Sequence, residues 1–272
     1  METKKKSEVK GKSRGISAGL VILICGIISF VVWNYVMGNP ERFVDNDRSN
    51  HPLPGDTLAL IFKGGYTVIV VMTLILTTLV LSVERFFAIT KAKGTGNLIN
   101  FVASVKHSLS QGDIKAAMDL CDKQKGSVAA VVTAGLKKYE EMETTTENIE
   151  KEQKLLSIQK EIEEATALEL PTMEQNLPVV ATISTLGTLL GLLGTVLGMI
   201  RSFSAMANAG APDSIALSTG ISEALINTAL GIGTGALAIT SYSFFTGKID
   251  NITYAIDEMG FSLVQTYAEK HK

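Results

Sequence analysis

The chain has 272 residues, of which 46% are hydrophobic and 19% charged, with a formal net charge of −2 and a mean hydropathy of +0.26. This composition agrees with a membrane protein, excludes several large domains and gives no reason to expect a nucleic-acid partner. The two cysteines, Cys25 in an apolar run and Cys121 in a polar one, lie far apart and do not indicate a disulfide framework.

Residues 1–15 form a basic segment with six Lys or Arg residues. Because the segment stands directly before an apolar run, we interpret it as a cytoplasmic positive-inside signal rather than a nucleic-acid arm. Residues 16–37 are then the first transmembrane helix, which ends in Trp33 and Tyr35, aromatics typical of a membrane interface. A cleaved signal peptide is the alternative, but the apolar run is longer than usual for one and no A-x-A site follows it.

Residues 38–64 are polar and rich in turn signals, and they are predicted to form a periplasmic loop. Residues 65–89 form the second transmembrane helix, and the lysines that follow it indicate a return to the cytoplasmic side. Glu84 and Arg85, near its end, fit either a functional pair or a helix end at the lipid headgroups, and we favour the second interpretation.

Residues 90–176 are predicted to be a helical cytoplasmic domain. Apolar side chains recur at helical spacing from Leu98 to Leu109, and Gly112-Asp113 ends that helix and caps the next. Residues 147–170 read as a long charged helix supported by opposite charges four residues apart.

Two further transmembrane helices, residues 177–203 and 214–247, are joined by a short periplasmic loop at residues 204–213. Each contains the roughly 20 apolar or small residues that a helix needs to cross a bilayer. Residues 248–272 continue the fourth helix as an amphipathic cytoplasmic helix. The predicted fold is therefore an all-α membrane protein with four transmembrane helices and with both termini in the cytoplasm.

Small residues line one side of the third and fourth helices, at the four- and three-residue steps that share a helical face. Such stripes let another helix approach closely, which drives helix association in lipid. The packing candidates are Gly187, Gly191, Gly194 and Gly198 in the third helix and Gly231 and Gly235 in the fourth.

Polar side chains repeat every seven residues in the same two helices: Thr188, Thr195 and Ser202 in the third, and Asn227, Thr234 and Ser241 in the fourth. Seven residues are two helical turns, so each trio lies along one face. Hydroxyls in membrane helices often bond only to their own backbone. The periodicity favours instead a polar seam that lines an ion path.

No pattern for enzyme chemistry stands out. The three histidines are scattered, and there is no Cys/His metal spacing, phosphate-binding loop or nucleophile elbow. Residues 231–235 spell Gly-Ile-Gly-Thr-Gly, but they lie inside an apolar helix with no strand before it, so we reject a nucleotide loop. We expect no enzyme activity, metal or cofactor. An ion gradient is the expected energy source, since one charge crossing the membrane gains ~2.3 kcal/mol per 100 mV.

Glu223 lies near the outer end of the fourth helix. It is either part of the ion pathway, as ionisable residues in membrane spans often are, or an acid stabilised by the helix dipole; the sequence leaves both open. No carboxylate stands clearly near a membrane midplane, so a proton relay has to borrow one from a partner. We expect Arg201, at the outer end of the third helix, to reach the headgroups.

Residues 190–203 (Leu-Gly-Leu-Leu-Gly-Thr-Val-Leu-Gly-Met-Ile-Arg-Ser-Phe) and residues 220–231 (Gly-Ile-Ser-Glu-Ala-Leu-Ile-Asn-Thr-Ala-Leu-Gly) resemble the signature of the MotA/TolQ/ExbB proton-channel family, most nearly that of ExbB. Residues 82–86 and Gly112-Asp113 are weaker supporting matches. The resemblance covers roughly residues 66–250.

The resemblance implies a homopentameric ring in the lipids of the bacterial inner membrane. Inside the ring, an ExbD-like single-span partner supplies a membrane aspartate, and the proton motive force drives a TonB-like protein that energises outer-membrane transport. By the same resemblance, Thr195 and Thr228 match family threonines that face the lumen, and Glu223 matches the family glutamate. The periodicity of the polar residues adds Thr188 and Thr234 to the predicted pathway.

The first transmembrane helix departs from the three-span pattern common in ExbB and TolQ. A TolQ-like, MotA-like or gliding-motor stator and a non-conducting scaffold therefore remain alternatives, as does Na⁺ in place of H⁺. A substrate transporter is disfavoured, because no proline breaks the third or fourth helix and no internal repeat is evident.

Overall fold

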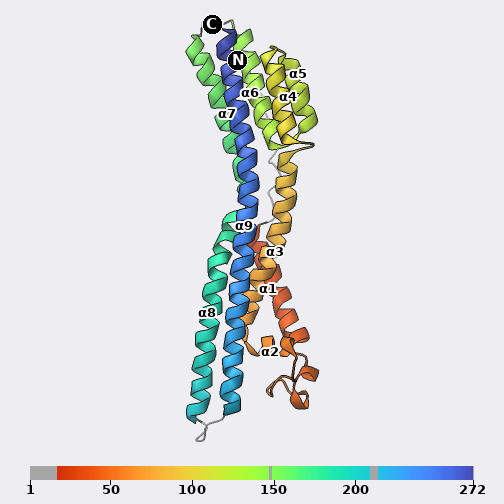
Figure 1. Ribbon diagram of the computed structural model, residues 1–272, viewed down its shortest axis with the longest axis vertical. Helices are drawn as coiled ribbons and strands as arrows, with labels where there is room; N and C mark the ends of the chain where they lie inside the picture. The colour runs from red at the N-terminus through yellow and green to blue at the C-terminus, as the bar shows by residue number, and fades with distance from the viewer. Residues whose placement is uncertain (1–16, 147–148, 209–213, 272) are drawn as a thin grey trace, which may run out of the picture.

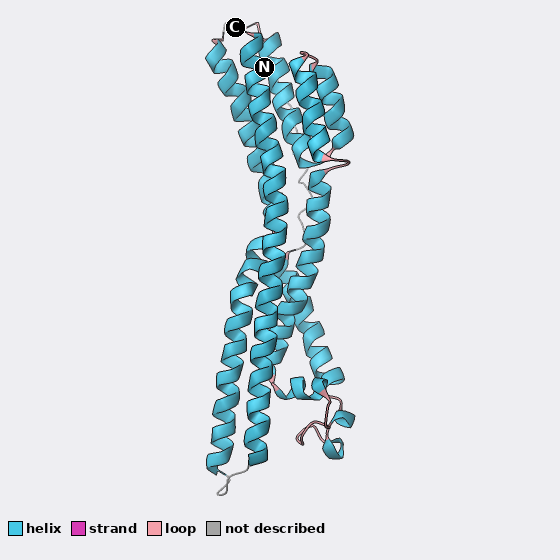
Figure 2. Ribbon diagram, in the orientation of Figure 1, coloured by secondary structure: helices cyan, strands magenta, loops and turns pink. Residues whose placement is uncertain are grey.

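The structure is a computed structural model of the chain, and it describes all residues except 1–16, 147–148, 209–213 and 272. Regular structure in the described residues is helical, apart from one isolated bridge between Phe43 and Pro52 (Figure 2). In chain order the helices are α1 (Ala18–Val31), the π-helix η1 (Val32–Met37), the 3₁₀ turns η2 (Pro40–Arg42) and η3 (Val44–Asn46), α2 (Thr57–Lys63), α3 (Tyr66–Lys93), α4 (Leu98–Ser110), α5 (Ile114–Gln124), α6 (Gly126–Thr144), α7 (Lys151–Glu174), α8 (Leu177–Asn208) and α9 (Ser214–Lys270). The all-helical prediction is confirmed.

The helices form an elongated bundle that is organised along α9 (Figure 1). At ~1.5 Å per residue, the 57 residues of α9 extend over about 85 Å. α8 and α3 pack along one half of α9, with α1 against α3, and α4 to α7 gather around the other half. The fourth helix was predicted to continue into residues 248–272, and α9 does continue without a break to Lys270 and joins both halves, while residue 272 lies outside the described residues.

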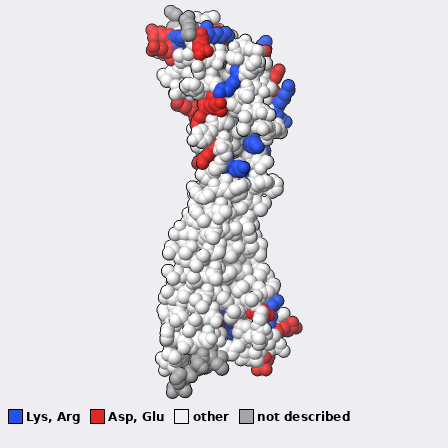
Figure 3. Space-filling view, viewed as in Figure 1, with Lys and Arg blue, Asp and Glu red and all other residues white. Residues whose placement is uncertain are grey.

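Four helical stretches of the described chain are long and apolar enough to cross a membrane, by length and composition. They lie within Ala18–Met37, Tyr66–Ser110, Lys151–Ser204 and Leu217–Lys270. Charged side chains gather at the two ends of the molecule, and a wide band between them shows none on the visible face (Figure 3). The described residues thus confirm four long apolar helices, whereas the predicted limits of their membrane-spanning parts and the side on which each loop lies stay predictions.

Each half of the bundle has its own apolar core. The larger core packs α4 to α7 against the second half of α9 and contains Tyr139 and Tyr267, whose rings meet edge to face at 4.8 Å. Burial raises the pKa of Tyr139 to about 12 and that of the Cys121 thiol to about 11. These groups are therefore neutral packing residues at physiological pH. The smaller core joins α1, α3, α8 and α9 and includes Cys25.

The structure corrects our interpretation of Glu84 and Arg85 as a helix end at the headgroups. Arg85 is only 1% exposed and forms an ion pair with Glu84. Its Nη1 donates to the carbonyl oxygens of Thr172 at 3.2 Å and Met173 at 3.1 Å. The last carbonyls of a helix have no partner within the helix, so Arg85 binds the end of α7 to α3.

The contact between Arg85 and the end of α7 also explains why α7 ends later than the sequence predicted. The sequence predicted a helix over residues 147–170, but α7 continues through Pro171 to Glu174. Arg85 satisfies carbonyls of this added turn. Asn176, with φ of 66°, then supplies the left-handed residue at the elbow before α8.

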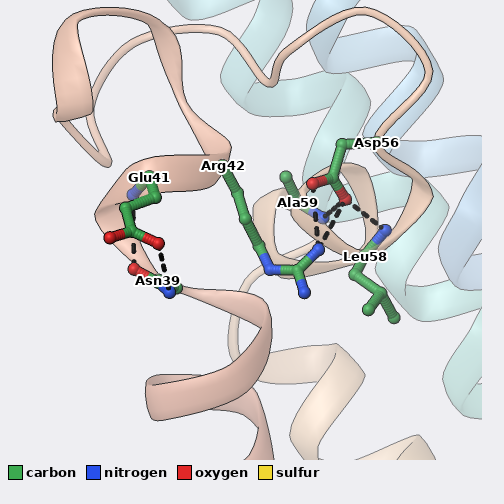
Figure 4. A network of polar contacts seen from close by, with 6 residues as sticks. All are labelled: Asn39, Glu41, Arg42, Asp56, Leu58 and Ala59. Atoms are coloured by element: carbon green, nitrogen blue, oxygen red, sulfur yellow. Dashed lines mark hydrogen bonds and ion pairs between the residues drawn. The ribbon is translucent and has the colours of Figure 1, made fainter.

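The loop between η1 and α3 is compact, and its polar network is drawn in Figure 4. Asp56 caps α2 by accepting from the backbone N–H groups of Leu58 and Ala59, each at 3.0 Å. The guanidinium of Arg42 reaches both carboxylate oxygens of Asp56, at 3.1 and 2.9 Å. The N–H of Ala59 and the Arg42 guanidinium outweigh burial, so the pKa of Asp56 lies below its usual value.

Candidate functional site

Backbone-to-backbone contact joins α8 and α9. A Cβ added to Gly191 would lie 2.8 Å from the Cα of Gly231, and one added to Gly231 would lie 2.5 Å from the Cα of Gly191. Carbon atoms in contact normally lie about 3.5–4.0 Å apart, so neither position has room for a side chain. The two helices pack at the closest approach that glycine allows.

The other predicted packing glycines also lie in this contact: Gly187 beside Thr234, Gly194 beside Asn227, Gly198 beside Ala224 and Gly235 beside Thr188. Partner numbers on α9 fall as numbers on α8 rise, as in an antiparallel pair. The sequence predicted that these stripes let another helix approach closely, and packing against a neighbouring subunit is one way to do so. The contacts described here lie within one chain, and contacts between chains stay a prediction.

Thr195 and Thr228 lie directly opposite each other across this contact, with their Oγ1 atoms in hydrogen-bond contact. Thr195 Oγ1 also reaches the carbonyl oxygens of Gly191 at 3.3 Å and Ala224 at 3.2 Å, and Thr228 Oγ1 reaches that of Gly191 at 3.4 Å. A hydroxyl has one proton, so these acceptors are alternatives. Both side chains are half-buried. Because each hydroxyl has more than one acceptor within reach, its proton can change acceptor by rotation of the hydroxyl alone, without movement of the helices.

The seven-residue repeats divide between surface and interior. Thr188 is exposed on α8, where its hydroxyl donates to the carbonyl of Ser184 at 3.3 Å. Thr234 is 0% exposed and donates to the carbonyl of Leu230 at 2.7 Å. Our sequence interpretation placed Thr188 and Thr234 on one open seam. The structure instead encloses Thr234 between α8 and α9, because Gly187 leaves it the space.

Glu223 lies half-buried near the start of α9 as the structure describes it. It interacts electrostatically with Lys63 at the end of α2 and with Arg201 on α8. Arg201 is exposed, as reaching the headgroups requires, and its Nη1 also lies beside Gly65. The end of α8 and the start of α9 thus bring one acid into the electrostatic reach of two cations, and this arrangement fits either interpretation of Glu223.

Asn227 is a residue whose place sequence reasoning missed. It is 3% exposed, and its Nδ2 donates to the carbonyl of Gly64 at 3.1 Å. Its side chain fills the space left by Gly194, so it ties α9 to α8 and to the corner between α2 and α3. The available signal was an amide in an apolar helix, opposite a glycine of the neighbouring helix.

No group of three or more His, Cys, Asp or Glu side chains in the described parts of the chain is arranged to hold a metal ion. The chemistry that this region offers is hydrogen bonding by hydroxyls, an amide and backbone carbonyls. Such groups carry no net charge and stabilise a passing carboxylate or ion without binding it permanently.

Comparison with known proteins connects this region to a family. The family model for the MotA/TolQ/ExbB proton channel family matches residues 123–258, which are 136 of the 272 residues. This range includes α8 and the first three quarters of α9, and with them every residue of the threonine pair and the glycine contact.

Individual relatives match shorter segments. An ExbB-like biopolymer transport protein of Synechocystis is 44% identical over 73 residues, 26% of this chain and 35% of the relative. An ExbB homologue of Methanothermobacter thermautotrophicus is 34% identical over 91 residues, 33% of this chain and 32% of the relative. The Tol-Pal system protein TolQ of Haemophilus influenzae is 29% identical over 84 residues, 31% of this chain and 37% of the relative. The matches thus span about a third of each relative's length.

Proposed function

Because the chain belongs to the MotA/TolQ/ExbB proton channel family, we propose that it is an ExbB-like stator subunit of an ion-driven motor in the bacterial inner membrane. With an ExbD-like single-span partner it uses the proton motive force to energise TonB-dependent outer-membrane transport. The observation that carries the proposal is the Thr195–Thr228 hydroxyl pair at the glycine contact of α8 and α9.

The pair supports a role in loading and releasing a proton on a carboxylate supplied by the partner. An ionised carboxylate is costly in an apolar environment unless hydrogen bonds stabilise it. Each threonine hydroxyl donates to an ionised carboxylate and accepts from a protonated one. Because Thr195 and Thr228 have the Gly191 carbonyl as an alternative acceptor, their protons are satisfied while no carboxylate is present.

The proposed assembly is a homopentamer around the partner helix, with both termini in the cytoplasm. Thr195 and Thr228 line the lumen, Thr188 extends that surface, and Glu223 lies at its outer end. Several large apolar side chains outside the apolar band are exposed in the single chain, among them Leu168 and Phe261. Contiguous exposed apolar surface marks an interaction site, and in the proposed oligomer a neighbouring subunit covers these side chains.

A TolQ-like stator of a Tol-Pal system is the second candidate. The TolQ proteins of Haemophilus influenzae and Pseudomonas aeruginosa are 29% and 31% identical over 84 residues each, close to the 34% of the Methanothermobacter ExbB homologue but below the 44% of the Synechocystis relative. A MotA-like or gliding-motor stator differs from an ExbB-like one in the machinery that it drives, and a non-conducting scaffold differs in that no ions flow through it. Identifying the partner distinguishes the stators from one another, and measuring ion flux distinguishes every stator from the scaffold.

The test combines Thr195→Val with Thr228→Val, which keeps the shape of both side chains and removes both hydroxyls. Proton flux is measured in liposomes that contain the protein and its single-span partner. We expect the double variant to assemble normally and to lose most of the flux. Thr182→Val is the matched control, because that exposed α8 hydroxyl donates only to the Pro178 carbonyl, at 2.8 Å. Wild-type flux in the double variant would refute the role of the pair, and Na⁺-dependent flux would identify the other coupling ion.

A further inference from the structure

A groove of ≈ 710 Å³ lies between the end of α3, the start of α4 and the middle of α9. Its floor is apolar and includes the buried side chains of Val102, Phe245 and Ile252. Phe86 of α3 and Phe244 of α9 also line it and are 54% and 53% exposed. The groove is far from the Thr195–Thr228 pair along α9, so neither the proton pathway nor the glycine contact accounts for it.

The groove stands where the chain changes from apolar to charged. In α3 the apolar run ends at Phe86-Phe87 and lysines follow, and in α9 it ends at Phe244-Phe245 and Lys248 follows. Both transitions line the same groove. In a bilayer this is the level at which hydrocarbon gives way to headgroups, because lysines that follow an apolar run extend their ammonium groups to the headgroups.

Three lysines line the groove, and among the described residues an acid pairs with only one of them. Lys106 forms an ion pair with Glu258 at 2.6 Å. Lys248 lies over the Phe244 ring, 5.5 Å from its centroid. In the described parts of the chain, no carboxylate forms an ion pair with Lys93 or Lys248. Two uncompensated cations therefore stand beside an apolar floor.

From this combination we infer that the groove binds an anionic phospholipid. The phosphate lies between Lys93 and Lys248, and an acyl chain lies along the floor between Phe86 and Phe244. A zwitterionic lipid fits less well, because its own cation competes for the phosphate and leaves the two ammonium groups uncompensated. The inference needs the chain to lie in a bilayer and does not depend on ion conduction.

The test measures lipid retention by the full-length protein, purified in detergent after equilibration with phosphatidylglycerol or phosphatidylcholine and then analysed by native mass spectrometry. We expect the wild type to retain phosphatidylglycerol and to retain little phosphatidylcholine. Lys93→Gln with Lys248→Gln is expected to weaken phosphatidylglycerol retention roughly tenfold or more, since each basic residue near an anionic headgroup contributes to binding. Glycerol phosphate, which has the headgroup chemistry without acyl chains, is expected not to displace the lipid.

Lys115→Gln with Lys137→Gln is the matched control, because both lysines are exposed, lie outside the groove and change the net charge equally. It is expected to retain lipid as the wild type does. Equal retention of the two lipids, unchanged retention in the groove variant or equal loss in the control variant would each overturn the inference. So would a wild-type oligomer that retains no phosphatidylglycerol and in which a second copy of the chain covers the groove.

Discussion

Replacing Gly231 by alanine tests whether the backbone contact holds the candidate site together. The new Cβ would lie 2.5 Å from the Cα of Gly191 and 2.6 Å from the carbonyl oxygen of Gly187. To restore a normal carbon–carbon distance, α8 and α9 have to separate by roughly 1 Å. Overpacking of this kind costs about 1–3 kcal/mol, and the better helix propensity of alanine offsets up to about 1 kcal/mol of it. We expect a net loss of roughly 1–2 kcal/mol.

Gly233 is the matched control, two residues along the same helix. A Cβ added there meets no atom within 4 Å, so Gly233→Ala is expected to be neutral or to stabilise α9 by up to about 1 kcal/mol. Thermal unfolding of both variants in the same detergent measures the difference. A shift to lower temperature in Gly231→Ala alone is the expected result.

The same separation of helices should reach the hydroxyl pair. Thr228 lies one turn from Gly231 and bonds toward Thr195 and the Gly191 carbonyl, so moving α9 away from Gly191 lengthens these contacts. Proton flux in liposomes with the single-span partner should therefore fall in Gly231→Ala and not in Gly233→Ala. The reasoning fails if Gly231→Ala has the unfolding temperature and the proton flux of the wild type, or if both variants lose flux equally.

Two further predictions concern other contacts. Arg85→Ala leaves the carbonyls of Thr172 and Met173 without this donor and leaves Glu84 with only the 3.4 Å hydrogen bond from Asn176, and we expect a loss of about 3–5 kcal/mol in thermal or denaturant unfolding. Arg85→Lys keeps the positive charge but not the forked guanidinium. If the guanidinium geometry matters, the lysine variant loses as much stability as the alanine variant, and if charge alone matters it loses none. Asp56 has a folded pKa below its usual 3.8, so its stabilising effect is present above that value and is lost as pH falls through the folded pKa. Unfolding followed from pH ~5 to ~3 should show a steeper loss in the wild type than in Asp56→Asn, and parallel curves would contradict the assignment.

Helix positions followed from the sequence because the periodicity of apolar residues is a local property. The apolar pattern from Leu98 to Leu109 lies in α4, and Asp113 caps α5 by accepting from the backbone N–H of Ala116. The same holds for the four long apolar helices, whose composition alone sets them apart.

Contacts between distant segments did not follow from the sequence. Arg85 reaches Thr172 and Met173, 87 and 88 residues along the chain, and nothing near Arg85 indicates these partners. A cation at the end of an apolar helix normally reaches the headgroups, so local reasoning placed it there. The neighbouring acid, Glu84, was the one available signal of a buried pair.

The candidate site shows the same division. Seven-residue spacing correctly groups side chains on one face of a helix, but it does not say what that face meets. Thr188 is exposed and Thr234 is enclosed, because the neighbouring helix offers a glycine beside Thr234. The prediction that Thr195 and Thr228 face the lumen came only from the family resemblance, and their direct contact depends on the relative rotation of two helices, which the sequence does not give.

In the function that we propose, the subunit keeps its shape while its partner moves, and the packing of α8 against α9 favours a stiff pair. Its contact at Gly191 and Gly231 contains no side chain whose rotation could let the helices slide. Asn227 fixes α9 to the corner between α2 and α3, and Arg85 fixes α3 to the elbow before α8. Close-packed regions move between discrete arrangements rather than deforming continuously. The backbone amides of α8 and α9 should therefore exchange hydrogen equally slowly with and without a proton gradient, and faster exchange on energisation would show that the subunit itself changes shape.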